Sequence, residues 1–355
     1  MRKIVADSSS YAMHFKCPLS EYLYKYYNTS GVVGKEEFKD TAFGSIAHDG
    51  VESLLMGGSL EEELHKAEFS LNERIPSEQT PDGVWRCQEL WWLLHGILRT
   101  FNDHYLPSFL QEYKVRAIEQ EYVIPLDEEV HWCTRPDATL ERRADGAYFN
   151  CNIKTSSWMK DLLKIYEFSV QMLMEAHAIK LNQGLDTGGT VILALNKGSK
   201  GKLSKLDVER GKSGYRFESP FTYVWWKNGT YSFEWSAKSE KVPVWEFNST
   251  PLEWYEKIPL GYRQSMVSIT PPIRHSSSMK YEDVVKDIVF VEKNCYDGKV
   301  PRSYDSCNNY GTYNKPCAYR TLCWGTPEEI AATYIPRTSN HPFEETIRTL
   351  NMEEL

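Results

Sequence analysis

Residues 131–155 read HWCTRPDATLERRADGAYFNCNIKT, and this stretch decides the fold. Two β-rich segments, His131–Leu140 and Ala147–Thr155, lie on either side of turn residues at Ala144-Asp145-Gly146. A third segment of the same kind, Ala117–Leu126, precedes them. The spacing predicts an antiparallel meander of three short strands.

Three polar residues of this meander point to metal chemistry. Asp137 is expected on one strand, and Asn152 and Lys154 on the next, where residues two apart share a face. Antiparallel pairing would bring the three to one end of the sheet. A carboxylate pair there would hold a divalent cation that activates water, and Lys154 could assist that water or stabilise charge on a phosphate. Spacing alone makes this group only suggestive.

Helices and further strands are predicted around the meander. Apolar residues recur at helical spacing through much of residues 8–115, and a helix is predicted over Lys160–Leu181. The continuous apolar run Thr190–Asn196 predicts a buried strand, and Phe221–Trp226 with Thr230–Trp235 predicts a hairpin. The chain is therefore expected to be α/β (α+β), with a mixed central sheet.

Four regions follow from this pattern. They are a helical N-terminal region (1–115), a mixed α/β core (116–245), a helical and cysteine-bearing region (246–325) and a weakly structured tail (326–355).

The composition is that of a folded, soluble chain. Of 355 residues, 41% are hydrophobic and 13% aromatic, so disorder is not expected to dominate. No apolar run approaches the roughly 18 residues of a membrane-spanning helix, and the first seven residues lack the apolar stretch of a signal peptide. We therefore expect a cytoplasmic protein without a membrane partner. The formal net charge of −8 is not that of an indiscriminate nucleic-acid binder, but DNA-cutting enzymes also need local carboxylates, so charge leaves this open.

Eight cysteines in a cytosolic chain favour metal sites or buried thiols over disulfides. Cys307, Cys317 and Cys323 form a C-x9-C-x5-C pattern, and Cys17 also stands apart from the rest. Four thiolates suit either a zinc ion or an iron–sulfur cluster, and the spacing does not choose between them. The remaining cysteines are expected to be ordinary thiols; they are Cys87, Cys133, Cys151 and Cys295.

A basic segment could contact nucleic acid. Residues 197–216 contain seven Lys or Arg against Asp207 and Glu209, and four of the lysines are candidate phosphate contacts. These four are Lys197, Lys200, Lys202 and Lys205. An ordinary solvated loop is the alternative. The aromatic residues of the predicted hairpin could stack on unpaired bases or could form a hydrophobic core.

Motifs in order along the chain resemble RecB-like members of the PD-(D/E)XK nuclease superfamily. Residues 8–22 resemble their S…F..CP..Y opening. The further active-site matches are the G-x3-H helix at Gly44 and His48, the aspartate at Asp137, the D/E-x-K-T position at Asn152-Ile153-Lys154-Thr155, and the helical Gln171. The cysteines resemble the cluster-binding cysteines of AddB-type and CRISPR-adaptation nucleases, in a spacing like that of phage versions; they are Cys17, Cys307, Cys317 and Cys323.

The resemblance implies a restriction-endonuclease-like core that hydrolyses DNA with Mg²⁺ or Mn²⁺. By position, the implied metal ligands are His48, Asp137, residue 152 and the carbonyl of Ile153. The implied catalytic set is Asp137, Asn152, Lys154 and Gln171, and the implied 4Fe–4S ligands are the four cysteines above. Exonuclease-type processing of single-stranded DNA or duplex ends follows, with a helicase or a recombination or replication protein as partner. Either Glu119 or Glu121 corresponds to a glutamate on the first strand.

One position departs from the family pattern. Residue 152 is Asn where the family has Asp or Glu, and the neutral amide lacks the charge that attracts a divalent cation. The chain is thus expected either to be an inactivated or impaired nuclease, or to be a catalytically silent protein that binds nucleic acid or a partner. A zinc-stapled structural protein is a third interpretation.

Overall fold

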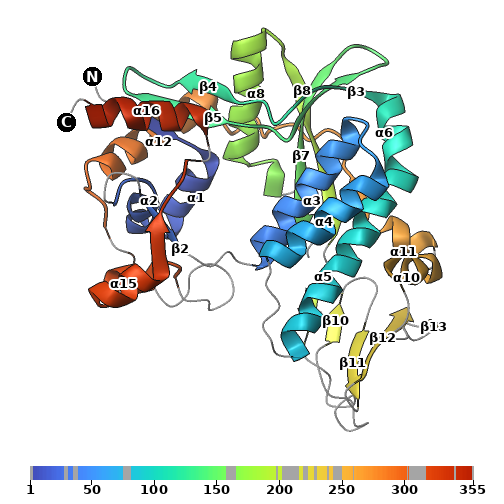
Figure 1. Ribbon diagram of the computed structural model, residues 1–355. Helices are drawn as coiled ribbons and strands as arrows, with labels where there is room; N and C mark the ends of the chain where they lie inside the picture. Colours follow the sequence, from blue (N-terminus) through green and yellow to red (C-terminus); the bar gives the residue numbers. More distant parts are fainter. Residues whose placement is uncertain are drawn as a thin grey trace.

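The computed structural model describes most of the chain and shows a mixed α/β fold (Figure 1). The described residues are 3–27, 31–34, 39–74, 81–156, 165–196, 199–201, 216–218, 223–227, 230–237, 240–242, 250–258, 260–301, 303, 317–339 and 341–353.

A five-stranded sheet forms the centre, in the order β14-β8-β7-β6-β3. Its strands are β3 (Tyr113–Ile118), β6 (Ala138–Arg142), β7 (Tyr148–Ser156), β8 (Thr187–Asn196) and β14 (Val267–Ile269). β7 and β8 are parallel, and the other neighbours are antiparallel. The predicted strands at 147–155 and 190–196 are confirmed as β7 and β8.

Helices cover both faces of this sheet (Figure 1). On one face lie α3 (Lys39–Leu55), α4 (Leu60–Arg74) and α5 (Pro81–Thr100), which pack against the odd-numbered residues of β7 and β8. On the other face lies α8 (Val170–Gln183), where Met172 packs against Ile192 and Ala194. Because side chains alternate along a strand, β7 presents one set of residues to α3 and the other to α8.

A second sheet, β1-β5-β4, carries the rest of the predicted meander. It consists of β1 (Ile4–Ala6), β4 (Tyr122–Pro125) and β5 (Val130–Thr134), with β1 parallel to β5. Trp132 is fully buried there against α8 and α12 (Tyr281–Tyr296).

The single meander predicted from sequence is wrong, because two of its strands each divide between the sheets. Residues 117–126 form the end of β3 and all of β4, and residues 131–140 form β5 and the start of β6. The breaks fall at Glu119, whose φ of 49° is left-handed, and at Arg135–Asp137, which contains a proline. Both features end a strand, since neither a left-handed residue nor a proline continues a regular ladder.

The chain's two ends pack together beside the central sheet and its helices (Figure 1). They contribute α1 (Ser8–Lys16), α2 (Pro18–Lys25), β2 (Val32–Gly34), α14 (Arg320–Trp324), α15 (Pro327–Thr333), β15 (Tyr334–Pro336) and α16 (Pro342–Glu353). β15 pairs with β2, and Tyr334 and Ile347 are buried. The expected weakly structured tail is therefore wrong for the described part of residues 326–355. Thr326 and Glu329 form a capping box that starts α15, a signal already visible in the sequence.

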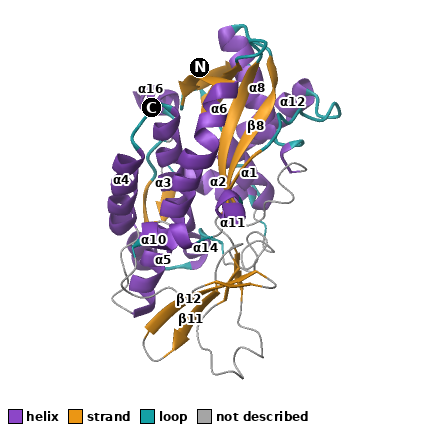
Figure 2. Cartoon of the chain, turned by 90° about the vertical axis from the view of Figure 1, so that its right-hand side faces the viewer, coloured by secondary structure: helices purple, strands orange, loops and turns teal. Residues whose placement is uncertain are grey.

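The remaining elements lie outside the two main sheets. The π-helix Phe101–Tyr105 and α6 (Leu106–Glu112) lead from α5 into β3, and α10 (Pro251–Lys257) and α11 (Leu260–Gln264) precede β14. The predicted hairpin is confirmed as β11 (Tyr223–Lys227) and β12 (Thr230–Ala237), which are extended by β13 (Glu240–Val242) and lie below the central sheet in Figure 2. β9 (Ser199–Gly201) pairs with β10 (Arg216–Glu218). Within the described ranges, no helix has the length and apolar character needed to cross a membrane.

Candidate metal centre

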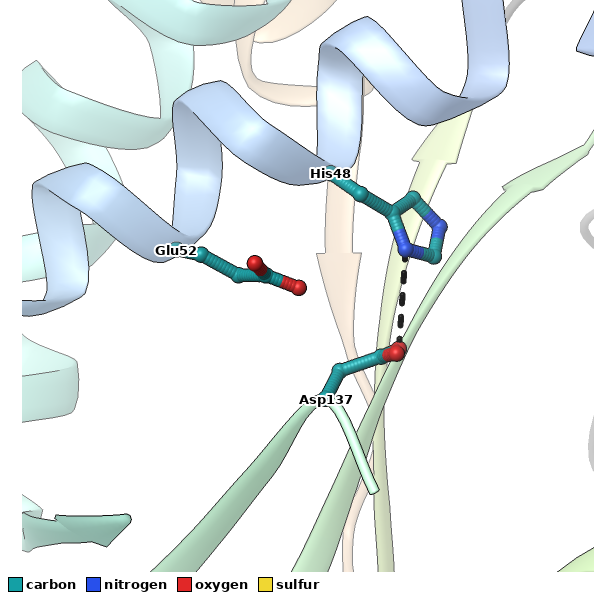
Figure 3. A group of neighbouring side chains, drawn as sticks. All are labelled: His48, Glu52 and Asp137. Atoms are coloured by element: carbon teal, nitrogen blue, oxygen red, sulfur yellow. Dashed lines mark ion pairs between the residues drawn. The ribbon is translucent and has the colours of Figure 1, made fainter. Parts of the chain in front are cut away.

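Three metal-ligating side chains converge between α3 and the start of β6 (Figure 3). His48 and Glu52 are one turn apart on α3, and Asp137 directly precedes β6. One ligand atom from each residue lies within 4.8 Å of the other two. Nδ1 of His48 is 3.7 Å from Oδ2 of Asp137. Among the described residues, this is the one group of three such side chains that could hold a metal ion.

The local sequence explains why α3 comes so close to the sheet. Gly44 is one turn before His48, and a Cβ atom there would lie 3.2 Å from the Thr155 hydroxyl on β7. Ala47 and Val51, on the buried side of α3, have no exposed surface. On the sheet side, the backbone N–H of Ile153 donates a hydrogen bond to Asp137 and ties this carboxylate to β7.

Acidic groups crowd this site. Burial raises the pKa of Glu52 to about 8, and the nearby charges of Glu119, Asp137 and Asp49 add to the rise. Burial also lowers the pKa of His48, although Asp137 opposes the shift, so the imidazole is neutral at pH 7. A neutral imidazole and clustered carboxylates are the ligand types that divalent cations take. The donor set therefore fits a divalent cation.

The structure distinguishes the two glutamates that the sequence left open. Glu119 faces the site, where it raises the pKa of Glu52 after the larger effect of burial, and it forms an ion pair with Arg135 at 2.6 Å. Its backbone N–H donates to the carbonyl of Asp137. Glu121 instead lies 3.1 Å from the imidazole of His341. Glu119 is thus the glutamate that belongs to this centre.

Asn152 belongs to a second polar group, on the α8 face of β7. Its side chain has no exposed surface, and its Nδ2 donates to Oε2 of Glu175 at 2.6 Å. Nε2 of Gln171 donates both to Oδ1 of Asn152, at 3.1 Å, and to Oε1 of Glu175, at 2.8 Å. Asn150 donates to Oε2 of Glu175 at 3.0 Å and accepts from the hydroxyl of Thr190 at 2.8 Å. Asn152 and Gln171, two members of the implied catalytic set, are thus in direct contact.

Lys154 acts electrostatically on both groups. Its side chain is half-buried, and its positive charge affects both sides. Burial lowers the pKa of His48, and Lys154 lowers it further. Burial raises the pKa of Glu175, and Lys154 opposes that rise. Of the predicted site residues, the structure thus brings His48 to Asp137 and Asn152 to Gln171, and it ties Asp137 to the backbone of Ile153.

Sequence reasoning missed two carboxylates. Glu52 was visible only as part of the helix with His48, and Glu175 was not considered. Both follow another site residue by four positions on a helix, as His48-x3-Glu52 and Gln171-x3-Glu175. Residues four apart on a helix share a face, so this spacing was the available signal.

The cysteine-bearing segments from the two ends of the chain meet in one cluster. Met13 and Leu19, on either side of Cys17, pack in the same hydrophobic cluster as Cys317 and Cys323. Backbone N–H groups approach two of the thiols at 3.4 Å, from Ser303 to Cys17 and from Tyr319 to Cys317. No disulfide joins any of the six cysteines whose side chains are described. Cys307 lies outside the described residues.

Other predicted residues have mixed outcomes. Cys133, Cys151 and Cys295 are buried, as expected for ordinary thiols. Lys200 is in β9, but its side chain lies outside the description. The other predicted phosphate contacts, Lys197, Lys202 and Lys205, lie outside the described residues.

No protein-family model matches the sequence, and no significant match is found among curated proteins. Function is therefore inferred from the residues and their geometry.

Proposed function

We propose that this chain is a metal-dependent deoxyribonuclease with a restriction-endonuclease-like PD-(D/E)XK core. The observation that carries the proposal is the convergence of His48, Glu52 and Asp137, where the charge of Lys154 also acts on His48. Nitrogen and carboxylate ligands next to a lysine suit phosphodiester hydrolysis, in which negative charge develops on the phosphate. The ordered resemblance to RecB-like nucleases supports the same activity.

Each residue has a distinct role in this mechanism. Mg²⁺ or Mn²⁺, when bound, would supply Lewis acidity and an activated water. His48, Glu52 and Asp137 would hold the ion, and the Ile153 N–H fixes the Asp137 carboxylate in place. Lys154 would stabilise charge on the phosphate.

DNA ends are the proposed substrate, and a helicase or recombination protein is the proposed partner. The net charge of −8 means that DNA binding must depend on local basic groups, for which residues 197–216 are the candidate. Exonuclease-type processing follows from the resemblance.

A 4Fe–4S cluster is proposed as a structural staple of the two chain ends. Its ligands would be Cys17, Cys307, Cys317 and Cys323. The shared packing around Cys17, Cys317 and Cys323 supports this arrangement, and the N–H···S contacts suit thiolate ligands. Anaerobically purified protein should absorb near ~400 nm, and Cys17→Ser should remove this absorbance. Stoichiometric zinc without iron would instead favour the zinc interpretation.

The test of the proposed activity is cleavage of labelled single- and double-stranded DNA with Mn²⁺ or Mg²⁺. Anaerobically purified protein should cut in the presence of the metal, at a rate that the neutral Asn152 reduces, and His48→Ala and Asp137→Ala should abolish this cutting. Metal-independent cutting, or equal rates in all three proteins, would contradict the proposal.

A silent nucleic-acid-binding protein is the second candidate. The hydrogen-bonded fit of Asn152 favours it, because this amide is well accommodated where the family has an acid. DNA binding without cleavage, at every metal tested, would support this candidate.

A further inference from the structure

Glu175 is a buried carboxylate that has no role in the reaction proposed above. It has no exposed surface and lies in the middle of α8. Three side-chain amides donate to its two oxygens, from Asn150, Asn152 and Gln171. All of its hydrogen-bonding partners in the described part of the chain are therefore neutral donors.

This arrangement fits the ionised form of Glu175. An ionised carboxylate only accepts hydrogen bonds, whereas a protonated one must also donate its O–H. Three N–H groups point at the carboxylate, and it accepts in each of these three hydrogen bonds. A buried negative charge requires a compensating positive charge, and among the described residues the charge of Lys154 acts on it.

Asn152 is the residue type that fits beside this carboxylate. Its Nδ2 donates to Glu175 at 2.6 Å, while its Oδ1 accepts from Gln171 at 3.1 Å. An aspartate at position 152 would place two carboxylates in contact, and like charges at such a distance do not both stay ionised without a cation between them. Only one of positions 152 and 175 can therefore carry a negative charge, and in this chain it is Glu175 on α8.

We propose that Glu175 is a positioning residue that supplies, from α8, the negative charge that Asn152 does not supply from β7. It acts through the two groups it contacts or attracts, the amide of Asn152 and the ammonium of Lys154. Asn152 is then the native partner of Glu175. This inference rests on the proposed metal-dependent activity.

A charge-swap series tests the pairing. Mn²⁺ affinity, by electron paramagnetic resonance, and melting temperature, in EDTA at pH 8, are measured for the unsubstituted protein and for Asn152→Asp, Glu175→Gln and the double variant. Glu175→Gln should weaken Mn²⁺ binding by about tenfold, a loss of the size seen for outer-shell partners, because it removes a buried negative charge that acts on Lys154 and Asp137. Asn152→Asp should lower the melting temperature in EDTA, because two carboxylates then face each other.

The double variant is the decisive member of the series. It keeps one carboxylate and one amide but exchanges their positions, so the amide now on α8 can donate to the carboxylate now on β7. Both the melting temperature and the Mn²⁺ affinity should therefore return toward those of the unsubstituted protein. The matched control is Glu292→Gln, at an equally buried glutamate remote from this site, which should lower the melting temperature and leave Mn²⁺ affinity unchanged.

The outcomes separate this inference from the proposed function. Unchanged Mn²⁺ affinity in Glu175→Gln overturns the inference alone, and so does a double variant that binds Mn²⁺ no better than Glu175→Gln. Absence of Mn²⁺ binding by the unsubstituted protein overturns both the inference and the proposed function.

Discussion

The two faces of β7 carry polar groups of opposite character. On the α3 side, His48, Glu52 and Asp137 lie close together with few hydrogen-bond donors among them. On the α8 side, Asn152 and Glu175 are wholly buried, and each is matched by amide donors or acceptors. The first face accumulates negative charge that a metal ion would relieve, and the second holds the Glu175 carboxylate in a set of amide hydrogen bonds. A buried polar network that satisfies its members rigidifies a fold, whereas crowded carboxylates mark a site for a ligand.

The largest expected effect comes from removing the Asp137 carboxylate, which the sheet side contributes to the metal centre. Asp137→Ala should reduce Mn²⁺ affinity by more than about 100-fold, beyond the effect of losing an outer-shell partner. Titration calorimetry measures this change. Asp145→Asn, at an exposed acid of the β6–β7 turn, is the control and should bind Mn²⁺ normally. Equal losses in both variants would place the metal elsewhere.

Loss of an uncharged member of the α8-face network should lower stability. Asn150→Leu removes one donor from Glu175 and leaves the Thr190 hydroxyl without its acceptor. We expect the free energy of unfolding to fall by about 1–3 kcal/mol, the cost of leaving buried groups unsatisfied. Urea denaturation measures it, with the more exposed Asn182→Ala as a near-neutral control. An unchanged unfolding curve for Asn150→Leu would show that the network does not hold this face together.

Stability without metal should depend on pH through Glu52. Its folded pKa of about 8 lies above the usual value of 4.5. A raised pKa means that the folded state binds the proton more tightly, so this contribution is present below about pH 4.5 and is lost as the pH rises through 8. The melting temperature in EDTA should therefore fall over this range, and saturating Mn²⁺ should reduce the fall. Glu52→Gln should flatten the EDTA curve; an unchanged slope in that variant would contradict this assignment.

The smallest effect is expected at Arg135, an exposed residue at the edge of the metal centre. Arg135 is exposed and pairs with Glu119 at 2.6 Å, and its charge opposes the rise in the pKa of Glu52, which burial dominates. Arg135→Gln should move the pH dependence of Mn²⁺ binding toward higher pH. The affinity for Mn²⁺ should change by about two- to fivefold, the size expected for an exposed ion pair. Binding measured between pH 6 and 9 checks this. A shift toward lower pH would contradict the stated role.

The sequence predicted the elements with strong local patterns. The apolar run of β8 and the hairpin of β11 and β12 are both confirmed. Asp137 was placed on a strand, but it lies in the link where the chain leaves one sheet for the other. Strand pairing between distant segments decides that division, and no local pattern reports it.

The candidate site was predictable only in part for a similar reason. His48, Asp137, Lys154 and Gln171 carried recognisable motifs, and the structure brings them to the two faces of β7. Glu52 and Glu175 look like ordinary helical glutamates in the sequence. Their importance depends on burial, which raises the pKa of both groups, and on neighbours from other elements: Glu119 and Asp137 add to the rise at Glu52, whereas Lys154 opposes it at Glu175.

The central claim is that His48, Glu52 and Asp137 hold a divalent cation. Crystals soaked in Mn²⁺ and measured at a wavelength where manganese scatters anomalously test it directly. We predict one strong anomalous peak within coordination distance of all three side chains, about 2.0–2.3 Å from the nitrogen and oxygen ligands. Full-occupancy manganese elsewhere, with no peak between these three residues, would contradict the account.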